Sequence, residues 1–140
     1  RDWQHFDSYP HSVEYKFNSR GFRDQEWPDD PIKRYSAIWC VGDSFTVGIG
    51  SPLENIWPQI LSQQTRKRTI NVSMDGASNT WIARKTIEIL KEIQPGNIVI
   101  HWGDIRRREK ENICIEQKGN RPIIQIEIEY EGIIGSQFPK

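Results

Sequence analysis

A short apolar run, Ala37-Ile38-Trp39-Cys40-Val41, is stopped by Gly42-Asp43-Ser44. A continuous apolar run of roughly 4–8 residues that ends at turn-forming residues is typical of a strand buried on both faces of a parallel sheet. Because Cys40 lies inside the run, it is expected to pack as a small buried hydrophobe. Ser44 is then expected in a loop at the carboxyl end of a buried strand.

Helices and strands alternate on the carboxyl side of this run. The clearest helix begins at Ser78 or Asn79 and ends at Pro95-Gly96. Its core-facing residues are predicted from helical spacing to be Ile82, Ala83, Thr86, Ile87, Leu90 and Ile93. The other predicted elements are a helix over residues 55–64, capped by Asn55, and strands over residues 70–73 and 97–102. Strands joined through helices by short links predict an α/β fold, with a parallel sheet and right-handed crossovers.

The two ends of the chain differ from this middle part. Residues 1–36 are aromatic, polar and irregular, which predicts an arm or cap with little regular structure. Its aromatic side chains are expected to cover a sheet edge, or alternatively to line a sugar- or acyl-binding surface. Residues 37–140 form the predicted domain. Near its end, residues 113–115 and an alternating segment at 124–130 flank Lys118-Gly119-Asn120, which predicts a C-terminal β-hairpin.

Composition argues against several classes of protein. In 140 residues, 19 Lys and Arg balance 19 Asp and Glu, so a protein that coats nucleic acid is not expected. No apolar run approaches the ~20 residues of a membrane span. Two cysteines are too few for a disulfide scaffold, and no metal-ligand spacing is present, so we expect neither a metal nor a cofactor. Compartment and oligomeric state stay open. The chain begins with Arg1, from which we expect a piece of a longer protein.

Three polar segments lie at the carboxyl ends of the predicted strands, where sheets of this kind bind ligands. They are centred on Ser44, Gly76 and His101. A serine at such a strand end is placed for nucleophilic attack, and backbone amides there can hold a developing oxyanion. Gly76 would let an amide approach the same centre without a side chain in the way. The simpler alternative is that Ser44 caps a helix and Gly76 only makes a turn.

Four segments resemble the GDSL, or SGNH, hydrolases, in the family's order and spacing. The first, Val41-Gly42-Asp43-Ser44-Phe45-Thr46-Val47-Gly48, is similar to the block that carries the family's serine. The others are the lead-in Asn18-Ser19-Arg20-Gly21-Phe22-Arg23-Asp24, the stretch 48–61, and a second block, Asn71-Val72-Ser73-Met74-Asp75-Gly76-Ala77-Ser78-Asn79. A lone Gly-Asp-Ser would be a weak signal, whereas four ordered segments are a specific one.

The resemblance implies a flavodoxin-like three-layer α/β/α fold, incomplete here at the C-terminus, and hydrolysis of ester bonds. Ser44 is then the nucleophile, and its amide and that of Gly76 are the oxyanion donors. Asp43 is expected to brace the loop by hydrogen bonding. The implied substrate is a small-molecule ester or an acylated sugar, and no cofactor is required.

One departure from the family concerns its third block. Ile105 stands where the family usually has an asparagine whose side chain is a further oxyanion donor. An ionised Asp104 only accepts hydrogen bonds and cannot replace that donor. Arg106, or else Arg107, could supply a cationic donor instead. Alternatively, this arginine-rich segment is simply a solvated charged stretch, or it binds an acidic group of the substrate.

A second departure concerns the general base. The family's last block supplies it as a histidine in Asp-x-x-His, and no histidine follows His101. Three explanations stay open: the chain lacks that block because it is truncated, His101 serves as the base, or the chain is a non-catalytic relative that binds a carbohydrate or acyl ligand. His101 could equally be a packed residue at a strand end. We attribute the spacing of Asp2 and His5 to chance.

A nucleotide- or phosphate-binding domain is the remaining alternative, with residues 42–50 as an anion loop. Against this alternative, the loop has no Walker lysine and no Gly-x-Gly-x-x-Gly fingerprint.

Overall fold

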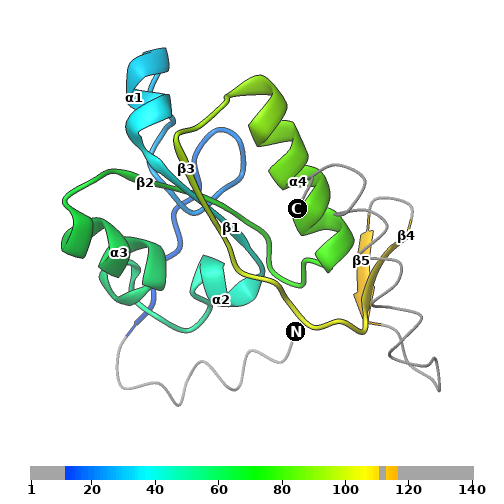
Figure 1. Ribbon diagram of the computed structural model, residues 1–140. Coiled ribbons are helices and arrows are strands. Elements are labelled where there is room, and N and C mark those ends of the chain that lie inside the picture. The colour runs from blue at the N-terminus through cyan, green and yellow to red at the C-terminus, as the bar shows by residue number, and fades with distance from the viewer. Residues whose placement is uncertain (1–11, 111–112, 117–140) are drawn as a thin grey trace.

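The computed structural model describes residues 12–110 and 113–116 (Figure 1). Its elements follow in the order α1 (Pro31–Ser36), β1 (Ile38–Gly42), α2 (Ser44–Val47), the 3-10 helix η2 (Leu53–Asn55), α3 (Trp57–Thr65), β2 (Thr69–Ser73), α4 (Asn79–Glu92), β3 (Asn97–Ile100), β4 (Arg107–Lys110) and β5 (Ile113–Glu116).

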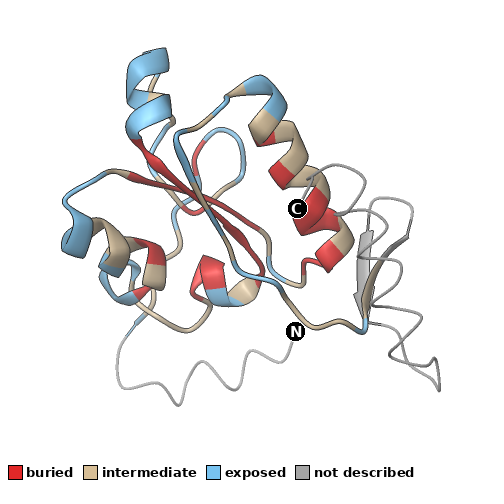
Figure 2. Ribbon diagram, in the orientation of Figure 1, coloured by how far each residue is buried: buried red, intermediate tan, exposed pale blue. Residues whose placement is uncertain are grey.

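β1 is the centre of a parallel sheet of three strands, in the order β2-β1-β3. Trp39 of β1 is in register with Ile70 on one side and Ile98 on the other. β1 and β2 are buried along their whole length, whereas β3 alternates between exposed and half-buried residues (Figure 2). The predicted α/β class with a parallel sheet is therefore confirmed, and Cys40 is fully buried as predicted.

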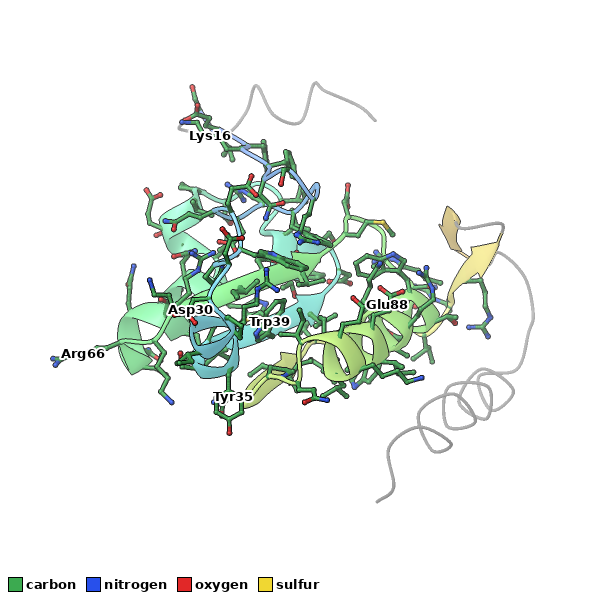
Figure 3. The ribbon with its side chains drawn as sticks, turned by 90° about the horizontal axis from the view of Figure 1, so that it is seen from above. Lys16, Asp30, Tyr35, Trp39, Arg66 and Glu88 are labelled. Atoms are coloured by element: carbon green, nitrogen blue, oxygen red, sulfur yellow. The ribbon has the colours of Figure 1, made fainter. Side chains whose placement is uncertain are left out.

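α4 packs against one face of the sheet, and the hydrophobic core lies between them. Trp39 is completely buried at the centre of the molecule, while Lys16, Tyr35 and Arg66 lie at its periphery (Figure 3). Each large apolar side chain buried here contributes about 1.5–3 kcal/mol to the free energy of unfolding. The buried core cluster comprises Ala37, Trp39, Val41, Ile70, Val72, Ala77, Trp81, Ile82 and Ile89.

The prediction for α4 was right about its start and partly wrong about its buried face. Ser78 is the N-cap, and its Oγ accepts a hydrogen bond from Trp81 N at 3.2 Å. The buried side chains include Trp81 and Ile89, which were not predicted, and leave Ile87 and Leu90 only half-buried. Apolar residues cover a broad arc of this helix, so spacing alone did not define which part of the arc faces the sheet.

The opposite face of the sheet is held largely by buried polar side chains of β2. Thr69 Oγ1 donates to the Pro58 carbonyl of α3 at 2.9 Å. Asn71 Nδ2 donates to the Thr46 carbonyl of α2, also at 2.9 Å. Since a buried polar group without a partner is costly, these bonds define how α2 and α3 sit on the sheet.

α3 begins two residues later than predicted. Asn55 ends η2 instead of capping the helix, and the capping position is taken by Ile56, which makes no side-chain cap bond. Pro58 lies in the first turn of α3, where no amide donor is needed. The extra turn before α3 therefore displaces the start that the capping rule predicted.

The segment before β1, which was predicted as an arm or cap with little regular structure, packs closely on the sheet. α1 lies within it, which was not predicted, and residues 12–30 contain no helix or strand. The ring of Trp27 meets that of Trp39 edge-on, with centroids 5.0 Å apart. Asp24 Oδ2 accepts a hydrogen bond from Asn71 N at 2.9 Å, so the arm covers the edge of β2.

β5 pairs with β4 in an antiparallel hairpin, with Arg108 opposite Ile115. A strand was predicted at residues 113–115, but with residues 124–130 as its partner, and that segment lies outside the described residues. The C-terminal hairpin as predicted therefore stays a prediction. None of the described helices is long and apolar enough to cross a membrane.

Candidate active site

The carboxyl ends of the three parallel strands converge beside α2 (Figure 1). The Val41 carbonyl at the end of β1 accepts a hydrogen bond from His101 N at 2.8 Å. The Gly42 carbonyl accepts one from Met74 N at 3.2 Å. These two bonds bring the segments that follow β2 and β3 to the segment that carries Ser44. The three polar segments identified in the sequence thus lie together.

Ser44 opens α2 directly after a tight turn. A Cβ on Gly42 would lie 2.0 Å from Thr46 Oγ1, so only glycine lets α2 fold back against the strand end. Asp43 caps the helix, because its Oδ1 accepts a hydrogen bond from Phe45 N at 3.0 Å. Ser44 is half-buried, and no described side chain hydrogen-bonds its hydroxyl. The hydroxyl is therefore available for chemistry.

Two backbone amides at this edge have no acceptor among the described residues. One belongs to Ser44, the first residue of α2, where helix amides lack an internal partner. The other belongs to Gly76, whose φ of +76° is the left-handed conformation that favours glycine. A Cβ on Gly76 would meet nothing within 4 Å, so the space beside its amide is open. Both amides can therefore donate to a bound oxygen.

The carboxylate of Asp43 is buried and shared by several groups. Besides the Phe45 amide on Oδ1, Arg107 Nη1 lies 3.1 Å from Oδ2. His101 Nδ1 lies 3.6 Å from Oδ1, which forms an ion pair when the imidazole is protonated. Asp43 thus braces the loop that carries Ser44 and also links it to the segment after β3.

His101 lies beside the loop that carries Ser44. A Cβ on Gly42 would be 3.2 Å from His101 Cβ, and the imidazole centroid is 6.0 Å from that of Phe45. An imidazole whose Nδ1 faces a carboxylate is the usual arrangement of a general base and the group that orients it. The other two histidines, His5 and His11, lie outside the described residues.

The two candidate arginine donors have different partners. Arg106 forks onto Asp104, with Nη2 to Oδ2 at 2.7 Å and Nε to Oδ1 at 3.1 Å. Hydrogen bonds from Arg106 hold the pKa of Asp104 at about 2. Arg107, rather than Arg106, is the arginine that reaches the loop of Ser44. Arg106 is therefore engaged with its neighbour in this structure.

Asn79 has a role that its position at a helix start did not reveal. Its Oδ1 accepts a hydrogen bond from Gly103 N at 2.7 Å, and its Nδ2 donates to the Gly103 carbonyl at 3.2 Å. The segment after β3 is therefore clamped to the start of α4. An amide side chain can bond a backbone donor and a backbone acceptor at the same time, so an asparagine at this position is compatible with such a clamp.

Arg23 is the second residue whose role sequence reasoning missed. It is almost completely buried, and its guanidinium donates to the carbonyls of Val47 at 3.0 Å and Gly48 at 2.8 Å. A further bond reaches the Ser51 carbonyl at 2.9 Å. Burial lowers the pKa of Arg23 from its ordinary value. Arg23 thus secures the end of α2, and its only sequence signal was its place in the lead-in at residues 18–24.

No family model matches this chain, and no curated protein matches it in sequence. The resemblance to the SGNH hydrolases therefore rests on the four ordered segments alone.

Proposed function

We propose that this chain is a serine ester hydrolase of the SGNH type, in which Ser44 attacks the acyl carbon. The proposal is carried by the Ser44 hydroxyl, which no described side chain bonds, and by the amides of Ser44 and Gly76, which have no acceptor among the described residues, at the converged strand ends. Each such donor contributes about 10²–10³-fold to turnover. The flavodoxin-like three-layer arrangement belongs to the same proposal, and the order β2-β1-β3 supports it.

The proposed reaction is acyl transfer in two steps. Ser44 Oγ bonds to the carbonyl carbon while its proton passes to a general base, and the carbonyl oxygen takes up charge facing the two amides. The ester oxygen then leaves with a proton, and water hydrolyses the acyl-serine. We assign the base to His101 and its orientation to Asp43, since Nδ1 of the imidazole faces that buried carboxylate.

A non-catalytic domain that binds a carbohydrate or acyl ligand is the second candidate. It is favoured by one observation: Ile105 occupies the place of the family's third oxyanion donor, while Arg106 is bound to Asp104. A phosphate-binding loop is disfavoured by the geometry, because the buried Asp43 carboxylate at the start of α2 would repel an anion there.

The first prediction follows from the nucleophile. A fluorophosphonate probe should label the full chain at Ser44, and Ser44→Ala should abolish the labelling, because the probe reacts with an activated serine. Ser36→Ala is the matched control, since Ser36 is exposed on α1 and its Oγ is bonded to the Ile32 carbonyl. Mass spectrometry of the labelled peptide identifies the site.

His101→Asn tests the assigned base in the same assay. Loss of a general base should slow the labelling by about 10²–10⁴-fold. An unchanged rate in His101→Asn would assign the base to another group. An unlabelled wild-type chain that still binds an acylated sugar would contradict the hydrolase and favour the second candidate.

A further inference from the structure

The Asp43 carboxylate is the most buried charge beside Ser44. Its side chain is only 3% exposed, and such a group needs a partner that compensates for lost hydration. Oδ1 of Asp43 accepts a hydrogen bond from the Phe45 amide and also faces His101, which is charged only when it is protonated. Among the described residues, it is Arg107 that brings a permanent positive charge to this carboxylate, in contact with Oδ2.

The segment that carries Arg107 is itself anchored. Gly103 is clamped by Asn79 through two hydrogen bonds, and a Cβ on Gly103 would lie 2.8 Å from Asp43 Oδ2. The chain after β3 therefore passes directly against the same carboxylate oxygen that Arg107 binds. Arg107 opens β4, which pairs with β5, and its side chain is 24% exposed. Its guanidinium is thus delivered to Asp43 by a constrained segment.

A shift of Asp43 must move Ser44, because the two residues are adjacent and Asp43 caps α2. The division of contacts between the oxygens has a further consequence. Arg107 holds Oδ2, so the carboxylate plane is turned with Oδ1 towards the Phe45 amide and His101. Without Arg107 the carboxylate would lose its partner on Oδ2 and would be held by the contacts on Oδ1 alone.

We propose that Arg107 is a positioning residue for the nucleophile: through Asp43 it holds the start of α2 and turns the carboxylate towards His101. Arg107 therefore acts on Ser44 indirectly and is not an oxyanion donor. The kinetic part of this inference rests on the hydrolase proposed above, whereas the structural part does not.

The test compares Arg107→Met, which removes the charge, with Arg107→Lys, which keeps it. Arg84→Met is the matched control, because Arg84 also pairs with a carboxylate, that of Glu88 on α4, whose side chain is 41% exposed. The fluorophosphonate labelling rate should fall roughly 10- to 100-fold in Arg107→Met, since small displacements of a catalytic group cost this much. Arg107→Lys should recover most of the rate, and Arg84→Met should match the wild type.

Amide hydrogen exchange at Phe45, followed by NMR, reports the same geometry without any activity. Exchange should be faster in Arg107→Met, because the bond from the Phe45 amide to Asp43 Oδ1 is loosened. If wild-type Ser44 is not labelled but this exchange difference appears, the hydrolase fails and the positioning role stands. Equal exchange in Arg107→Met and Arg84→Met would overturn the inference.

Thermal unfolding separates positioning from general stability. The inference expects a folded Arg107→Met chain; if that chain does not fold, Arg107→Gln takes its place under the same criteria. Failure of both to fold would also overturn the inference, because Arg107 would then act on the whole fold.

Discussion

Two carboxylates near the end of β3 show how surroundings determine the behaviour of a single residue. Asp43 is buried between an amide, an imidazole and Arg107. The side chain of Asp104 is 32% exposed and binds Arg106, two residues further along the chain. The buried pair joins distant parts of the chain, whereas the exposed pair is local. Of the two, the buried pair is therefore the one that can hold the start of α2, where Ser44 lies.

The local pair leads to a prediction about titration. Arg106→Met should raise the pKa of Asp104 from about 2 part of the way towards the ordinary value of 3.8, because the side-chain hydrogen bonds that stabilise its charge are lost while the bond from the backbone amide of residue 106 remains. In the wild type the folded pKa is depressed, so the stabilisation is present above pH ~4 and is lost as the pH falls through about 2. A ¹³C NMR titration of the carboxyl group measures the midpoint. A midpoint that stays near 2 in Arg106→Met would contradict this cause.

At the scale of elements, α2 is too short to be stable alone and is held at both ends. Isolated helices below about 12 residues are marginal in water. Asp43 caps the start of α2, and Arg23 binds the carbonyls of Val47 and Gly48 at its end. Gly48 ends the helix in the left-handed conformation, with φ at 75°. The placement of Ser44 thus depends on a local cap at the start of one turn of helix and on a tertiary contact from Arg23 at its end.

The end of α2 gives an element-scale prediction. Gly48→Ala should destabilise the chain because its φ is +75° and its Cβ would lie 1.9 Å from Ile56 Cγ2. Gly21→Ala is the matched control, with a φ of +85° but nothing within 4 Å. In Gly21→Ala the free energy of unfolding should fall by about 1–2 kcal/mol from backbone strain alone. In Gly48→Ala it should fall by a further ~1–3 kcal/mol from overpacking. Urea unfolding measures the stability of both variants. An equal loss of stability in the two would show that the clash with Ile56 is relieved.

Sequence patterns predicted the elements better than their contacts. The three strands of the parallel sheet and α4 were located because apolar runs and helical spacing are local signals, whereas β4 falls in a charged segment where no strand was predicted. The start of α3 was misplaced because η2 precedes it, and the buried arc of α4 depends on where the sheet lies. At the site, Ser44, Asp43 and Gly76 follow from strand ends and turns. The contact of Arg107 with Asp43 spans 64 positions, so only the folded chain reveals it.

At the scale of the whole molecule, the segment before β1 is part of the structure that supports the site. Arg23 binds the end of α2, Asp24 covers the edge of β2, and Trp27 packs against Trp39. Burial raises the pKa of Asp24. The Asn71 amide and Arg68 partly offset this effect because they stabilise the charged carboxylate. These contacts reach both the core and α2, the helix that carries Ser44. The predicted division at residue 37 can therefore be tested by removing this segment.

The final prediction tests this integration. A chain that begins at Ala37 should lose cooperative unfolding, because β2 would have an uncovered edge and the carbonyls at the end of α2 would lose the donor Arg23. Urea unfolding followed by far-UV circular dichroism compares it with the full chain. A chain beginning at Ser12 is the control, since it keeps every contact described above. An equally sharp transition for the chain beginning at Ala37 would show that residues 37–140 fold alone, and the segment before them would then be an accessory cap.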